Sequence, residues 1–187
     1  MEIALLVAIV AAIGTWIIAT NNLLGLKDRA VDYLRNKLGS SLEEEISRRY
    51  LERDRELLSE IRDLLPSDYP ISKLRHYDFG GVYRDELPKR IISFLRECEK
   101  PEFEFHDSEL EVLRQELEDA AQRFSRASGE SAFYLEGSTD MIKIPDKWHH
   151  KYPDKWHNAR NELNESADEI VDTYDDLVRL GRKKLGE

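Results

Sequence analysis

Cysteine is almost absent from this chain of 187 residues, which contains only Cys98. A single cysteine cannot form a disulfide within the chain, whereas secreted domains of this size often carry several. Cysteine usage therefore favours a cytoplasmic location for most of the chain. Cys98 lies on the predicted inner face of a helix, which favours a place in the core over a role as a nucleophile.

The sequence also lacks the local signatures of common enzyme classes. It has no glycine-rich loop of the Walker type, no His-Glu-x-x-His, no Gly-x-Ser-x-Gly and no cysteine pair for zinc. His76 and His106 lie close to Asp78 and Asp107, but such pairs are common at helix caps and turns. We therefore expect a protein that is not an enzyme, with no catalytic residues and no cofactor.

Basic residues are outnumbered by acidic ones, with 28 Lys and Arg against 38 Asp and Glu and a net charge of −10. Nucleic-acid binding needs cations that neutralise phosphates, so we expect no nucleic-acid partner. Charged residues make up 35% of the chain and apolar residues 41%. This composition is typical of charged amphipathic helices rather than of disorder.

One long apolar run stands at the N-terminus, from Ile3 to Ala19, with no charged residue and Thr15 as its one hydroxyl. As a helix it would be about 26 Å long, close to the thickness of a bilayer's hydrocarbon core. A cleaved signal peptide would carry a basic start, but Glu2 follows Met1. A buried core helix would show polar residues on one face. The run therefore predicts a transmembrane anchor over residues 1–26.

The charges that flank the run predict its orientation. No Lys or Arg precedes it, whereas Lys27, Arg29, Arg35 and Lys37 follow it closely. The positive-inside rule then places the N-terminus outside and residues 27–187 in the cytoplasm of a single-pass membrane protein. The lipid bilayer is accordingly the first expected partner.

Small residues of the run fall on one helix face and form a possible oligomerisation seam: Ala4, Ala8, Ala11, Thr15 and Ala19. Such a seam lets two helix backbones approach closely in lipid, and it predicts a homo-oligomer. Ordinary alanine usage in a membrane helix explains the pattern equally well, because small-xxx-small spacings arise easily by chance.

After the anchor, the spacing of apolar residues predicts a juxtamembrane amphipathic helix over 27–40 that stops at Gly39, and a helical domain over 41–187. Ser41 and Glu44 fit a capping box that opens the next helix, which Pro66 ends. The apolar stripe of that helix consists of Leu42, Ile46, Tyr50, Leu57, Ile61 and Leu65. Its gap at Arg53 and Asp54 predicts a loosely packed stretch.

The fold class predicted for the rest is mainly α, a helical bundle built on a long antiparallel hairpin of helices over 107–128 and 153–184. Asp107 is the expected N-cap of the first of these helices, and Asp85 that of a shorter helix before it. Phe103 and Phe105 alternate with glutamates and predict an extended piece with two buried rings. The insert over 129–152 is non-helical and resembles a small β-hairpin.

The pentapeptide PDKWH occurs twice, at 145–149 and 153–157. Helix initiation explains both copies, because Pro and Asp favour the first helical turn. The second interpretation is a metal site, with Asp146, His149, Asp154 and His157 as ligands at i,i+3 spacing. The third is contact with a membrane surface and the fourth a ligand or partner patch. These two use the same residues: Lys147, Trp148, Lys151, Tyr152, Lys155 and Trp156.

Together these patterns favour a membrane-tethered interaction or scaffold module that oligomerises and holds a protein partner at the inner face of the membrane. A membrane effector is the first alternative, in which the cytoplasmic domain senses a signal and the assembled spans disturb the bilayer. A metalloenzyme that uses the Asp-x-x-His repeat is the second.

Overall fold

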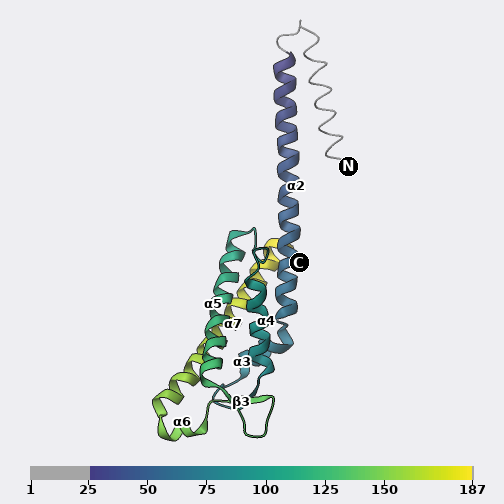
Figure 1. Ribbon diagram of the computed structural model, residues 1–187. Coiled ribbons are helices and arrows are strands. Elements are labelled where there is room, and N and C mark those ends of the chain that lie inside the picture. The colour runs from purple at the N-terminus through teal and green to yellow at the C-terminus, as the bar shows by residue number, and fades with distance from the viewer. Residues whose placement is uncertain (1–25, 187) are drawn as a thin grey trace. The chain divides into compact units, whose positions relative to one another are not determined.

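The computed structural model describes residues 26–186, and the chain divides into two compact units, Met1–Arg49 and Tyr50–Glu187. The predicted anchor and its seam of small residues lie outside the described residues. No helix within 26–186 is long and apolar enough to cross a membrane. The predictions that the structure bears on are therefore those for the helices and strands within residues 26–186, which Figure 1 shows in colour.

Helix α2 runs without a break from Leu26 to Leu64. The predicted stop at Gly39 and the capping box at Ser41 are therefore wrong. A glycine inside a helix costs only about 1 kcal/mol relative to alanine, which the good helix formers around it offset. An N-cap residue needs non-helical dihedral angles, so a serine within a continuous helix cannot cap it. The predicted end before Pro66 is confirmed.

Only the second half of the predicted α2 stripe lies in the core. Leu57, Leu58 and Ile61 are fully buried, whereas Leu42 and Ile46 are 60% and 40% exposed. The predicted loose stretch around Asp54 is wrong, because Asp54 is only 3% exposed. Its carboxylate accepts hydrogen bonds from the backbone N–H groups of His106 and Asp107, at 2.8 and 3.0 Å.

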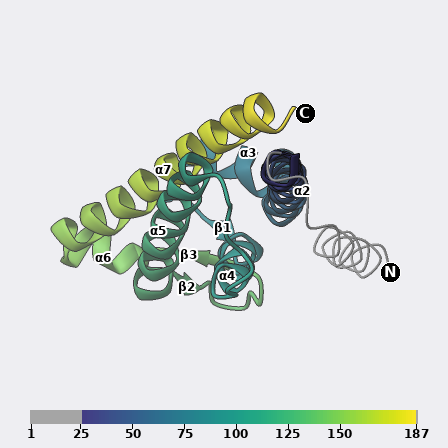
Figure 2. The same cartoon turned by 90° about the horizontal axis from the view of Figure 1, so that it is seen from above.

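Helices α5 (Ser108–Ser131) and α7 (Pro153–Leu185) lie side by side and form the predicted hairpin (Figures 1 and 2). Ion pairs join Asp107 to Lys184 near one end and Arg126 to Glu162 near the other, so the two helices are antiparallel. Their facing side chains are buried: Leu117, Ala120, Phe124, Leu163, Ala167, Ile170 and Tyr174. This confirms the helical bundle.

Asp107 is the N-cap of α5, as predicted, since its carboxylate accepts from the N–H groups of Glu109 and Leu110 at 3.0 and 3.1 Å. Its pKa lies below the ordinary value because Lys184 and these N–H groups favour the charged form, against the opposing effect of burial. The predicted burial of Phe103 and Phe105 is also confirmed, at 2% and 6% exposed.

Irregular structure connects α2 to α5. A short helical segment, η1 (Ser67–Ile71), is followed by α3 (Ser72–His76) and then by α4 (Glu86–Cys98). Asp85 stands at the N-cap of α4, but its side chain makes no capping hydrogen bond. It accepts instead from Lys89 Nζ at 2.5 Å and from the Tyr134 hydroxyl at 2.6 Å, so its predicted capping role is wrong.

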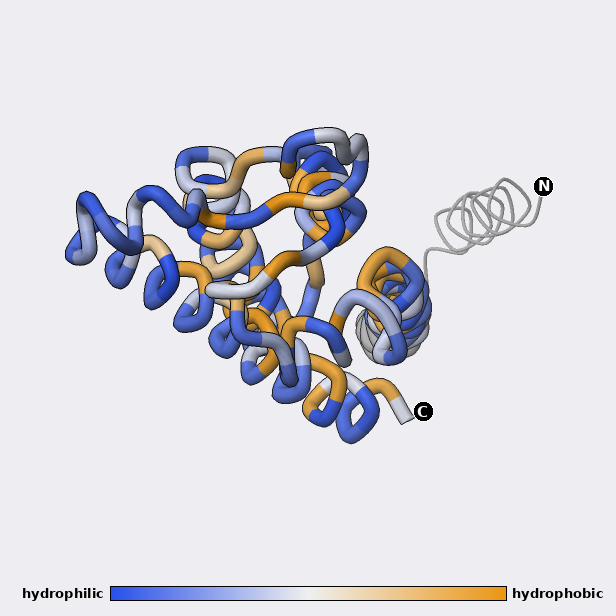
Figure 3. Tube along the Cα trace, turned by 90° about the horizontal axis from the view of Figure 1, so that it is seen from below, coloured by the Kyte–Doolittle hydropathy of each residue, from blue (hydrophilic) through white to orange (hydrophobic). Residues whose placement is uncertain are grey.

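The predicted β-hairpin is present and carries one more strand than expected. The prediction that the whole insert over 129–152 is non-helical is wrong, because α5 continues to Ser131 and a short helix, α6, covers Asp146–Lys151. Strands β2 (Phe133–Tyr134) and β3 (Met141–Lys143) pair antiparallel, and β1 (Tyr83–Arg84) adds to the other edge of β3. In the β1–β3 register, Tyr83 faces Ile142 and Arg84 faces Met141. Seen from below, hydrophobic and hydrophilic residues alternate along the chain (Figure 3).

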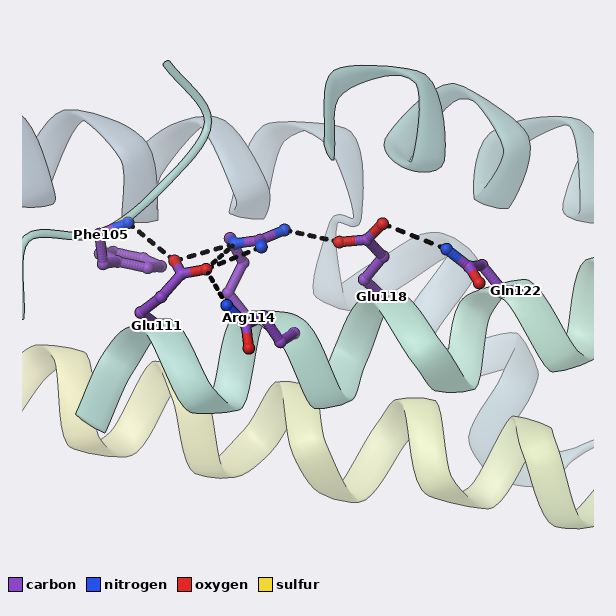
Figure 4. A network of polar contacts seen from close by, with 6 residues as sticks. Phe105, Glu111, Arg114, Glu118 and Gln122 are labelled. Carbon is purple, nitrogen blue, oxygen red and sulfur yellow. Dashed lines mark hydrogen bonds and ion pairs between the residues drawn. The ribbon is translucent and has the colours of Figure 1, made fainter. Parts of the chain in front are cut away.

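A charged network on α5 is largely buried (Figure 4). Arg114, 5% exposed, donates to Glu111 and to Glu118, and Glu111 also accepts from the backbone N–H of Phe105 at 2.9 Å. Burial raises the pKa of the nearby Cys98 thiol to about 12, so the thiol stays protonated at neutral pH. Half-buried Cys98 therefore belongs to the packing of the bundle.

Candidate functional site at the PDKWH repeat

Each copy of the repeat starts a helix. Pro145 is the N-cap of α6 (Asp146–Lys151), and Pro153 is the first residue of α7. A single residue, Tyr152, separates the two helices, and its N–H donates to the Trp148 carbonyl at 2.8 Å. Pro at these positions has a preset φ and no N–H that the helix would leave unpaired. The helix-initiation interpretation is confirmed.

The tryptophan of the first copy lies in the core. Trp148 is 8% exposed, and Phe133 of β2 meets it edge-on with 6.0 Å between ring centroids. The ammonium group of Lys155, from the second copy, lies 3.6 Å from the centroid of the Trp148 ring. A ring covered in this way is not presented to a membrane or a ligand, so the prediction that Trp148 belongs to a surface patch is wrong.

The tryptophan of the second copy is half-buried and enclosed by basic side chains. His149 of the first copy lies edge-on to Trp156 at 4.7 Å, and His157 at 5.2 Å. The guanidinium carbon of Arg160 lies 5.9 Å from the ring centroid. The two copies therefore cross-pack, because each covers the tryptophan of the other.

The repeat leaves more positive than negative charge on the surface, because its exposed lysines outnumber the exposed Asp146 and Asp154. Lys147, Lys151 and Lys155 are exposed, and no ion pair joins them to a carboxylate within the described part of the chain. Tyr152, 58% exposed, and the exposed rings of His149, His150 and His157 lie on the same two helix starts. We refer to these seven residues as the basic corner: Lys147, His149, His150, Lys151, Tyr152, Lys155 and His157.

Of the four candidate metal ligands, the structure brings two close together. The ring centroids of His149 and His157 are 6.2 Å apart. Asp146 is engaged in an ion pair with Lys143. No group of three or more His, Cys, Asp or Glu within residues 26–186 is arranged to hold a metal ion.

The start of α7 is tied to the loop before β1 by a constellation that the sequence did not indicate. Arg160 donates to both carboxylate oxygens of Asp78, at 2.8 and 2.7 Å, and Asn164 donates to one of them at 3.3 Å. Asn164 also accepts from the backbone N–H of Phe79. The Arg160 guanidinium holds the pKa of Asp78 well below its usual range. The partners are 82 residues apart, so no local motif marks them.

Comparison with known proteins returns no relative for this chain. No family model, no curated protein and no solved structure matches it.

Proposed function

We propose that this protein is a membrane-tethered, non-enzymatic interaction module whose helical domain binds an acidic protein partner through the basic corner. The observation that carries the proposal is a set of exposed lysines with no carboxylate partner among residues 26–186, in a chain with a net charge of −10. Local charge opposite to that of the whole protein favours association with a surface of complementary charge.

A protein surface fits the basic corner better than a bilayer does. Binding to the membrane interface draws on exposed aromatic rings as well as cations. Within residues 145–157, Trp148 is buried and Trp156 is enclosed by histidines, which leaves Tyr152 as the exposed Trp or Tyr side chain of this segment. The remaining lysines and histidines are donors suited to carboxylates.

The tether is part of the proposal and rests on the sequence alone. The apolar run from Ile3 to Ala19 supports a single span, and the basic residues after it support a cytoplasmic domain. Self-association through the seam of small residues would present several basic corners together and raise the avidity for a partner with repeated acidic sites.

Binding of a glutamate-rich peptide to the full chain in neutral detergent micelles tests the corner. We expect the triple variant Lys147→Glu, Lys151→Glu, Lys155→Glu to weaken binding at least about tenfold at moderate salt. The matched control is Arg96→Glu, Arg182→Glu, Lys183→Glu, which changes the net charge equally on exposed residues elsewhere. It should bind nearly as well as the unchanged chain.

Two results would contradict the proposal. Equal loss in both triple variants would show that net charge and not the corner attracts the peptide. Corner-dependent binding to anionic vesicles that exceeds binding to the peptide would identify lipid as the partner.

The tether has a separate test in bacterial or eukaryotic cells that express the full chain. We expect the protein in the membrane fraction after an alkaline carbonate wash, and a chain that starts at residue 27 in the soluble fraction. Cross-linking of full chain and of an Ala8→Leu, Ala11→Leu variant tests the seam. Full chain that washes off the membrane would refute the tether.

A further inference from the structure

A cavity beside strand β1 differs in charge from a second cavity near the start of α5. The second cavity, of about 300 Å³, is lined by Arg53, Glu102, Glu104 and His106. Its arginine donates to the Glu102 carbonyl at 3.0 Å and pairs with Glu56 at 3.4 Å, so its positive charge is already engaged. The cavity beside β1 has a volume of about 210 Å³ and two cations in its lining, Lys73 and Arg84.

Neither cation in this cavity is closely neutralised. Lys73 has no ion pair with any carboxylate among residues 26–186, and its ammonium lies 3.7 Å from the centroid of the Tyr77 ring. Arg84 has a long contact of 3.8 Å with Asp140, and both side chains are more than half exposed. A pair at this distance and exposure contributes little, so the guanidinium is available to a ligand.

The neighbouring carboxylates have partners of their own. Asp85 accepts from Lys89 Nζ at 2.5 Å, and Glu86 pairs with Arg90 at 3.4 Å. The guanidinium carbon of Arg90 in turn lies 5.9 Å from the centroid of the Tyr69 ring, which lines the cavity. The cations around the cavity thus retain a net attraction for an anion in spite of the acidic composition of the chain.

The apolar part of the cavity lining comes from four separate segments. Tyr69 comes from η1, Val82 from the loop before β1, Leu87 from α4 and Met141 from β3. The two cations of the lining, Lys73 and Arg84, lie on α3 and β1.

The framework around the cavity is well packed. Tyr83 of β1 is 2% exposed, and its hydroxyl lies 3.2 Å from the Ser128 hydroxyl. Leu87 is 1% exposed. Arg84 and Met141 face each other across the β1–β3 pair, so a cation and an apolar side chain are presented side by side. A preformed apolar hollow with a few convergent polar groups is the usual form of a small-ligand site.

We propose that this cavity binds a small phosphate monoester, with the phosphate between Lys73 and Arg84 and a compact apolar body against Val82, Leu87 and Met141. A phosphate monoester carries nearly two negative charges at neutral pH, which match the two cations. The volume of about 210 Å³ is sufficient for one ring beside the phosphate. The same chemistry is found in soluble phosphate esters and in lipids with a monoester headgroup.

Calorimetric titration of the full chain with phenyl phosphate tests the proposal. We expect saturable binding that weakens at least about tenfold in Lys73→Met and in Arg84→Met, since each removes one charged contact. Arg96→Met and Lys183→Met, which remove exposed charges elsewhere, should change the affinity less than about twofold. Circular dichroism of every variant checks that the fold is retained.

A third variant separates the two halves of the ligand. Met141→Ala should weaken the binding of phenyl phosphate and leave the weaker binding of inorganic phosphate unchanged, because only the ester has an apolar body.

Titration with vesicles that contain phosphatidic acid distinguishes a soluble phosphate ester from a lipid headgroup as the ligand. Stronger binding to these vesicles than to phenyl phosphate assigns the site to a lipid headgroup. Absence of saturable binding to both, or equal affinities in the cavity and control variants, would overturn the proposal. The triple variant Lys147→Glu, Lys151→Glu, Lys155→Glu should bind phenyl phosphate as the unchanged chain does. Failure of one proposal is therefore distinguishable from failure of the other.

Discussion

The two copies of PDKWH share five residues in the same order, yet their tryptophans have different surroundings. Trp148 is 8% exposed and has Phe133 of β2 on its edge, whereas Trp156 is half-buried and has histidines and Arg160 around it. The difference arises outside the repeat. The first copy follows β3 directly and packs on the sheet, and the second continues into the long helix α7.

The comparison shows that a local sequence can fix a helix start without fixing burial. Pro and Asp open a helix in both copies, because their effect lies in the first turn. The depth of each tryptophan depends on which neighbour the chain brings to it. Four substitutions test this difference between the two copies, with expected effects that decrease from the first to the last.

Trp148→Ala should have the largest effect. It removes a buried ring from the core and leaves a cavity, so we expect it to lower the free energy of unfolding by about 3–5 kcal/mol. Urea unfolding of the full chain in neutral detergent, followed by circular dichroism, measures the change. A loss below about 1 kcal/mol would mean that the ring is not part of a packed core.

Trp156→Ala should cost less, about 1–2 kcal/mol, because a half-buried ring loses less contact area. The same unfolding experiment gives the value, and Trp148→Ala serves as its reference. If both substitutions cost the same, the two copies would be equivalent in energy and the contrast in burial would have no consequence.

Asp78→Asn removes the carboxylate that holds Arg160 beside the second copy, and the first copy has no counterpart of this pair. Because the pKa of Asp78 is lowered in the folded state, its stabilisation is present above the unfolded pKa of about 3.9 and is lost as the pH falls below it. With half-exposed partners we expect about 0.5–1 kcal/mol at pH ~7. The difference from the unchanged chain should shrink between pH ~5 and ~3 in urea titrations. A difference independent of pH would contradict this.

Lys155→Gln should have the smallest effect, a loss of about 0.5 kcal/mol from the contact of its ammonium with the Trp148 ring. The equivalent residue of the first copy, Lys147, covers no ring, so Lys147→Gln is the control and should be near neutral. Thermal unfolding of both variants side by side checks this. Equal changes in melting temperature would show that the contact contributes nothing.

Much of the fold could be predicted from periodicity and capping. Patterns among residues that are close in the sequence predict several of its features. These are the hairpin of α5 and α7, the cap at Asp107, the buried rings of Phe103 and Phe105, and the small β-hairpin. The helix starts in the repeat follow in the same way. Local rules apply here because the tertiary contacts agree with them.

The features that the sequence did not predict depend on distant partners. Strand β1 is only two residues long, and it is defined by pairing with β3 almost sixty residues later. The Asp78–Arg160 pair and the burial of Trp148 against Phe133 are likewise tertiary. Gly39 is an error of the opposite kind, in which a local pattern predicted too much. The glycine predicts the end of a helix, but the helix continues on both sides of it.

Asp54 also fixes the rotational register of α2 within the second unit. Its carboxylate binds the two N–H groups that lead into α5, and its neighbours along the chain are Arg53 and Arg55. Turning or sliding α2 by one residue would bring an arginine to these donors, which would then face a cation instead of an acceptor. The rotation of α2 about its helix axis is therefore determined by charge as well as by the shape of its apolar side chains.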